Sequence, residues 1–180
     1  MRLRVSNGWV DYDLNLYLDI ARPIDEHLDR LFTVIETDFS TADMFDYPLT
    51  VDHLLGVGLV AAQVYLRGAI AEQAAPMPEA LSIGPRLSSG ASVVQLINHG
   101  ANLWKHADAS WDWDAPDWRQ GLILRALADE GIDGDQYILI ELVRRITGAR
   151  RPHLTELSPF LQEWRNTLDE RYPERRTKKG

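Results

Sequence analysis

The 180-residue chain contains no cysteine. That absence excludes disulfides, thiolate nucleophiles, and zinc or iron–sulfur sites with cysteine ligands. The sequence also lacks the His-Glu-x-x-His motif of zinc proteases and the Gly-x-Ser-x-Gly motif of serine hydrolases. No phosphate-binding loop is present, because "GPRLSSG" lacks the required lysine. We therefore expect neither a bound metal nor a cofactor.

Long hydrophobic runs are also missing. The chain begins "MRLRVSNGWVDYD", which has no apolar stretch typical of a signal peptide. The most apolar run, "LLGVGLVAAQVYL" at residues 54–66, is shorter than the roughly 18 residues that a membrane span needs. These observations predict a cytoplasmic protein with no membrane partner.

Charge is distributed unevenly along the chain. The last ten residues hold five basic residues and Glu174, a net charge of +4. Because the whole chain has a net charge of −8, residues 1–170 have a net charge of −12. An acidic body repels nucleic acid and favours basic partners. We expect one domain over residues 1–172, large enough to bury about 70% of its surface, and a basic tail over 173–180.

Hydrophobic periodicity predicts a helix over residues 12–37. Apolar residues recur there at steps of three and four, from Leu14 to Ile35. Pro23 should kink this helix or start a second one. Residues 12–20 also alternate as a strand would, but their aspartates fit a strand poorly. Residues 2–10, with the turn signal "SNG", predict a short β-hairpin.

Further helices are predicted at 51–73, 92–107, 115–129, 136–147 and 159–172, with a loop at 39–49 and a long connection at 75–91. Thr50 or Asp52, Ser92, Asp114 and Asp135 are suited to cap helix starts, and Gly131 and Gly148 to end helices. The fold class is therefore all-α, a single-domain helical bundle of about six helices.

Three histidines and a glycine motif favour structural roles. "GVGLVA" at 56–61 fits Gly-x-Gly-x-x-Ala, but no strand precedes it, so Gly56 and Gly58 indicate close helix packing rather than a dinucleotide site. His27, His53 and His153 stand alone, as structural histidines commonly do.

The helix at 92–107 carries an unusual polar arc. On a helical wheel, six side chains fall within about 60° of Asn102, and apolar residues fill the other side. None of the six is acidic, and they are Gln95, Asn98, His99, Asn102, Lys105 and His106. Such groups suit either a hydrogen-bonded seam between helices or a face for neutral or anionic ligands. Both interpretations stay open.

Tryptophans and aspartates alternate after this helix, in "WDWDAPDW" at 111–118. An extended segment would place Trp111 and Trp113 on one side. These rings either anchor a loop to the bundle or, with Asp112, present an aromatic and acidic surface. Such a surface would bind Arg or Lys of a partner through cation–π contacts and ion pairs.

The segment "NHGANLWKHADASW" resembles the Asn-x-x-Lys-His segments of uncharacterised bacterial helical proteins, some of them near the HEPN (higher eukaryotes and prokaryotes nucleotide-binding) superfamily. The resemblance covers about twenty residues and rests on Asn102, Lys105, His106 and Trp111. It implies a helical bundle, with His106, Lys105 and Asn102 as catalytic candidates for metal-independent RNA cleavage. This chain departs from the superfamily's Arg-x4–6-His motif, which matches only at Arg22 and His27.

The sequence as a whole favours a non-catalytic interaction module, of a defence, immunity or toxin–antitoxin type, that binds a basic protein. The binding candidates are Asn98, His99, Trp111, Asp112 and Trp113. A HEPN-like ribonuclease acting on RNA is the first alternative, and a small-molecule-binding bundle is the second. A homodimer is compatible with each of them.

Overall fold

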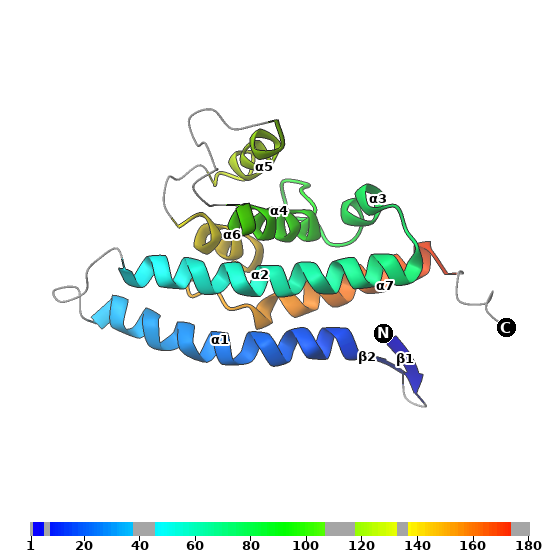
Figure 1. Cartoon of the computed structure of the whole chain (residues 1–180), viewed down its shortest axis with the longest axis horizontal. Coiled ribbons are helices and arrows are strands. Elements are labelled where there is room, and N and C mark those ends of the chain that lie inside the picture. The colour runs from blue at the N-terminus through cyan, green and yellow to red at the C-terminus, as the bar shows by residue number, and fades with distance from the viewer. Residues whose placement is uncertain (1, 6–7, 38–45, 107–117, 133–136, 174–180) are drawn as a thin grey trace.

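The computed structural model describes residues 2–5, 8–37, 46–106, 118–132 and 137–173. These residues form an all-α bundle with a two-stranded hairpin at the N-terminus, which confirms the predicted fold class (Figure 1). The helices are α1 (Tyr12–Thr37), α2 (Asp46–Gln73), α3 (Met77–Ser82), α4 (Val93–His106), α5 (Trp118–Ala128), α6 (Ile138–Thr147) and α7 (Ser158–Arg171).

The N-terminal hairpin pairs β1 (Arg2–Val5) with β2 (Gly8–Asp11) in antiparallel register, as predicted. Asp11 then joins strand to helix, since its side chain accepts a hydrogen bond from the backbone N–H of Leu14. Helix α1 continues through Pro23 without a second start. Pro23 lies on the exposed side of α1, where water can satisfy the carbonyl that its missing N–H leaves free.

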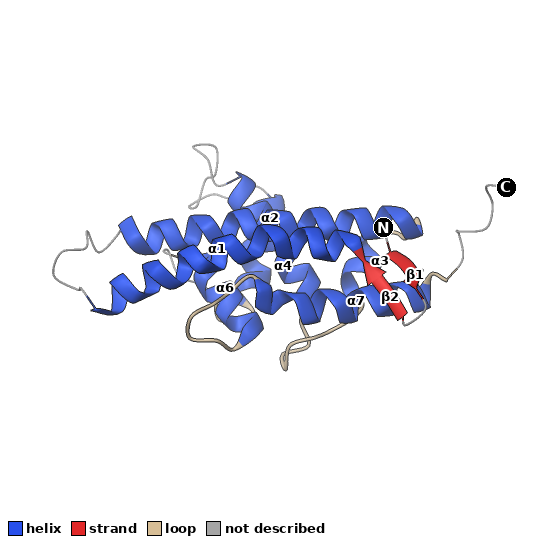
Figure 2. Cartoon of the chain, turned by 90° about the horizontal axis from the view of Figure 1, so that it is seen from below, coloured by secondary structure: helices blue, strands red, loops and turns tan. Residues whose placement is uncertain are grey.

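Helix α2 is the centre of the bundle, because it contacts α1, α4, α6 and α7 (Figures 1 and 2). It begins at Asp46, five residues before the predicted start at 51. By length and composition alone, the stretch Tyr47–Gln73 is apolar enough to cross a membrane, but 56% of its most apolar window is buried inside the fold. A core helix meets the same criterion, because it must be apolar on nearly every side.

The connection predicted at 75–91 contains a helix that the sequence pattern did not indicate. Helix α3 is short and has Pro78 in its first turn, where a missing N–H costs nothing. Its Ala80 is buried, and the carbonyl of Ala80 accepts a hydrogen bond from the indole Nε1 of Trp164 in α7 at 2.7 Å. Tertiary contact therefore stabilises this turn of helix.

Two aspartates cap helices to which they do not belong. We expected Thr50 or Asp52 to cap the start of its own helix, but α2 begins at Asp46 and both residues lie inside it. Asp52 instead accepts hydrogen bonds from the backbone N–H groups of Leu139 and Ile140 at the start of α6. Asp25 of α1 likewise accepts hydrogen bonds from the N–H groups of Leu154 and Thr155, at the start of the 3-10 helix η1 (Thr155–Leu157) that leads into α7. These carboxylates satisfy helix N-termini that lack a local cap.

The predicted helix ends are confirmed where the structure describes them. Gly148 adopts a left-handed conformation, with φ 73°, and donates its N–H to the carbonyl of Arg144. Gly131 ends the turn after α5 in a similar conformation. Ser92 precedes α4 and accepts a hydrogen bond from the N–H of Gln95 at 3.4 Å. Asp114 and Asp135 lie outside the described residues.

Glycines set the spacing of the central helices. A side chain at Gly56 would overlap the ring of Trp104, and one at Gly58 would overlap Leu154. A side chain at Gly100 of α4 would likewise overlap Leu142 of α6. The close-packing role predicted for Gly56 and Gly58 is therefore confirmed, and Gly100 has the same role in α4.

Replacing Gly58 by Ala should lower the free energy of unfolding by about 1–3 kcal/mol, because the added methyl group overfills the contact with Leu154. Gly68 of the same helix has open space around its Cα. Gly68→Ala should therefore raise stability by up to about 1 kcal/mol through helix propensity alone. Urea unfolding of both variants, at low protein concentration, measures the difference, and equal effects of the two substitutions would contradict this account.

Candidate functional site

Helix α4 is amphipathic as predicted, with an apolar face buried in the core. Val93, Leu96, Ile97, Gly100 and Leu103 are all buried. The polar arc on the other side does not form one surface, however. The structure divides it into a part that faces α2 and a part that faces the turn after α5.

The first part is a hydrogen-bonded seam organised by Gln63 of α2. Gln63 is 2% exposed, and its amide Nε2 donates to Oδ1 of Asn98 at 2.8 Å and to Oδ1 of Asn102 at 2.9 Å. The ammonium of Lys105 donates to Oε1 of Gln63 at 2.7 Å. One buried amide thus connects three residues of the arc, and their polar groups are used in hydrogen bonds between α2 and α4.

Lys105 shares its surroundings with a second cation. Burial lowers the pKa of Lys105 below its ordinary value, and the positive charge of Arg67 on α2 lowers it further. Arg67 and Lys105 therefore place two positive charges close together where α2 meets α4.

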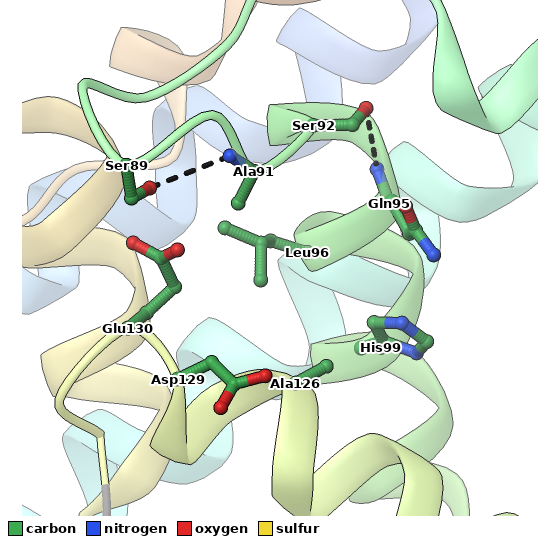
Figure 3. A pocket seen from close by; sticks show the side chains of 9 residues that line it. All are labelled: Ser89, Ala91, Ser92, Gln95, Leu96, His99, Ala126, Asp129 and Glu130. Atoms are coloured by element: carbon green, nitrogen blue, oxygen red, sulfur yellow. Dashed lines mark hydrogen bonds between the residues drawn. The ribbon is translucent and has the colours of Figure 1, made fainter.

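The second part of the arc lines a pocket of about 320 Å³ between α4 and the turn after α5. Gln95 and His99 form one side of it, and Asp129 and Glu130 form the other, with Leu96 between them (Figure 3). Ser89, Ala91 and Ser92 from the segment before α4 complete the wall. Its volume lies at the lower end of the range of about 300–1,000 Å³ typical of ligand pockets.

This pocket combines a neutral imidazole with two carboxylates. Burial lowers the pKa of His99 below its ordinary value, so the ring is uncharged at neutral pH. Its Nδ1 is buried and has no hydrogen-bond partner among the described residues. Glu130 is buried and accepts a hydrogen bond from Nε of Arg145 at 3.3 Å, whereas Asp129 is exposed. No Lys or Arg belongs to the pocket lining.

The serines at the pocket wall have structural hydrogen bonds. Ser92 donates its hydroxyl to the carbonyl of Leu81. Ser89 accepts a hydrogen bond from the N–H of Ala91, and Ser92 accepts one from the N–H of Gln95 (Figure 3). Neither is bonded to His99 in the described structure, so no Ser-His pair with the geometry of a nucleophile and its base is formed.

The three catalytic candidates do not form one site. Asn102 and Lys105 belong to the Gln63 seam, while His106 is exposed at the last position of α4. Arg22 and His27, which match the superfamily spacing, contact Asp19 and Arg30 on the surface of α1. Trp111, Asp112 and Trp113 lie outside the described residues. Within the described part of the chain, no group of three or more His, Asp or Glu side chains is placed to hold a metal ion.

A second hollow, of about 440 Å³, lies between the end of α1 and α6. Its charged groups are paired with one another or with neighbours: Glu141 with Arg144, and Glu36 with Arg150 and Arg151. Because these charges are already balanced, this hollow is a weaker candidate than the pocket at His99.

Sequence reasoning missed Gln63, Asp129 and Glu130. A signal for Gln63 was present, because it is a single amide within the apolar run 59–66 and a buried amide needs partners. The two carboxylates follow α5 in a turn, and only the packing of α5 on α4 places them opposite His99.

Gln63→Leu should lower the free energy of unfolding by about 1–3 kcal/mol, because Asn98, Asn102 and Lys105 lose a shared partner in a partly buried seam. Gln95→Leu removes the same amide from an exposed position of α4 and should change stability by less than about 0.5 kcal/mol. Thermal or urea unfolding compares the two. A stable Gln63→Leu protein would show that the seam contributes little to the fold.

Comparison with known proteins finds no matching family model, no similar curated protein and no similar solved structure.

Proposed function

We propose that the protein is a non-catalytic interaction module that binds a basic protein, and that its pocket at His99 accepts a Lys or Arg side chain of that partner. The observation that carries the proposal is the composition of this pocket. Two carboxylates and an uncharged imidazole surround one cavity whose lining contains no cation. A guanidinium or ammonium group would complement these acceptors.

The balance of charge supports a cationic guest. Arg145 neutralises Glu130 from outside the pocket lining, but exposed Asp129 has no cation among the described residues, so the pocket keeps a net negative charge. The unpartnered Nδ1 of His99 supplies a further polar group at the wall. The acidic body of the protein would steer a basic partner toward it and speed association. An immunity or antitoxin protein that neutralises a basic partner would have such a surface.

A ribonuclease is less well supported by this geometry. Acid–base cleavage of RNA needs a histidine near a second base or a cation that holds the phosphate. His106 is exposed, and Lys105, its neighbour, is engaged with Gln63. The HEPN relationship stays a hypothesis from the segment at 98–111.

An arginine-containing peptide tests the binding proposal. In ¹⁵N-resolved NMR titrations, Gly-Gly-Arg-Gly-Gly should shift the amides of Ala91, His99, Ala126 and Asp129, whereas Gly-Gly-Gln-Gly-Gly should not. Asp129→Asn should weaken this binding at least about tenfold, since the exposed carboxylate pairs with the guanidinium. Higher salt should also weaken it.

The matched control is Glu163→Gln, which removes one exposed carboxylate from α7 and changes net charge equally. It should leave peptide binding intact. Equal loss in the Asp129 and Glu163 variants would mean that overall charge, and not the pocket, attracts the peptide. Shifts spread evenly over the surface would also contradict the proposal.

A cleavage assay addresses the enzyme alternative. Single-stranded RNA of mixed sequence, incubated in EDTA with wild type or with His106→Ala, should be cleaved no faster than in buffer alone, because His106 has no catalytic partner among the described residues. Product bands on a denaturing gel provide the measurement. Cleavage that wild type performs and His106→Ala loses would replace the interaction module with a metal-independent nuclease.

A further inference from the structure

Lys105 fixes the direction of every hydrogen bond in the seam between α2 and α4. A lysine ammonium can only donate, so the end of the Gln63 amide that faces Lys105 must be its oxygen, Oε1. The other end of that amide, Nε2, is a donor, and the groups that face it must be acceptors. Asn98 and Asn102 accordingly turn their Oδ1 atoms toward Nε2, at 2.8 and 2.9 Å. One cation thus sets the orientation of three amide groups.

This orientation leaves hydrogen-bond donors on the outer side of the seam. The Nδ2 groups of Asn98 and Asn102 donate to no other described residue, and neither is among the buried polar atoms without a partner. Both side chains are partly exposed, so their N–H groups face solvent. Lys105 is exposed and keeps two N–H groups besides the one that Gln63 accepts. The outer side of the seam therefore offers amide and ammonium donors together.

Arg67 adds a second positive charge at the same place. It lies on the exposed side of α2, one helical turn after Gln63, and has no ion pair with the described residues. Its charge lowers the pKa of Lys105, so the two cations are close, and no described carboxylate counters this effect. Two neighbouring cations repel each other, and an anion that binds between them is attracted by both.

We propose that these four residues, Asn98, Asn102, Lys105 and Arg67, form a donor edge that binds the phosphate group of a small phosphorylated molecule. A phosphate monoester has a charge of about −1.5 to −2 at pH 7 and three acceptor oxygens, which match two cations and the amide donors beside them. A carboxylate has one charge and two oxygens, so it would leave one cation unpaired. No residue of the donor edge lines the pocket at His99, so this inference does not depend on the proposed function.

The charge of the whole protein favours a small ligand over a nucleic acid. Residues 1–170 have a net charge of −12, which repels a polyanion that extends across the surface. A single phosphate group is affected mainly by charges within about 8 Å at physiological salt, and these are the two cations. No histidine belongs to the donor edge, and His106 lies about 100° around the helix from Lys105. The edge therefore binds a phosphate group without an imidazole to cleave its ester.

NMR of the ¹⁵N-labelled full chain tests the proposal, because the donor groups are themselves observed. Glycerol 3-phosphate at pH 7.5 should shift the side-chain NH₂ signals of Asn98 and Asn102 in a saturable way, and sodium chloride at equal ionic strength should not. Arg67→Gln should weaken binding about tenfold or more, since a charge-assisted contact is lost. Arg30→Gln makes the same charge change at an exposed position of α1 and should bind as wild type does. Equal weakening in both variants, or no saturable shift in wild type, overturns the proposal.

Asn102→Asp tests the orientation of the amides. An aspartate keeps an oxygen that accepts from Gln63, but it replaces the outward N–H group by a negatively charged oxygen. Phosphate binding should therefore be lost while circular dichroism shows a folded protein. Asn15→Asp adds the same charge at an exposed position of α1 and should leave binding intact. Binding that survives in Asn102→Asp would place the phosphate elsewhere and overturn the proposed site.

A single-stranded RNA of about twelve nucleotides distinguishes the class of ligand. At physiological salt it should bind no more tightly, per phosphate group, than glycerol 3-phosphate does, because the acidic body repels the rest of the chain. RNA that binds more than about tenfold tighter, and that loses this affinity in Arg67→Gln, would show that the edge serves nucleic acid. That result would overturn the assignment of a small phosphorylated ligand.

Discussion

The close approach of α2 and α4 is the constraint on which the rest of the structure depends. Gly56 admits the ring of Trp104, and Gly100 admits Leu142 and Leu59, so the two helices lie nearer than side chains would otherwise permit. At that separation, the amide of Gln63 reaches Asn98, Asn102 and Lys105. Apolar contact fixes the distance between the helices, and the hydrogen bonds fix their register, because a shift along either axis would leave a buried amide unpaired.

The same packing decides which polar groups remain for binding. Once α2 occupies one side of α4, Asn98, Asn102 and Lys105 have partners inside the protein. Gln95 and His99 point the other way, where α5 and the turn after it bring Asp129 and Glu130. The resulting pocket is acidic, whereas the arc on the isolated helix is neutral to basic. At the pocket, the groups offered to a guest therefore change from those suited to an anion to those suited to a cation, and this change depends on tertiary contacts alone.

Charged and apolar side chains on the surface are also distributed unevenly among the helices. The chain is acidic as a whole, but Arg67 of α2 lies close enough to Lys105 of α4 to lower the pKa of Lys105. Leu16 of α1 and Val64 of α2 are exposed apolar side chains, while the pocket at His99 lies on other elements.

The sequence by itself determined the helical class, the N-terminal hairpin, most helix positions, the ends at Gly131 and Gly148, and the buried face of α4, because these depend on local periodicity and turn chemistry. Only the tertiary structure decided that Asp52 caps α6, that helix α3 forms, and that the polar arc divides in two. Each of these involves partners distant in sequence, such as the 42 residues between Gln63 and Lys105. Periodicity gives the direction of a side chain around its own helix, but not which neighbour occupies that side.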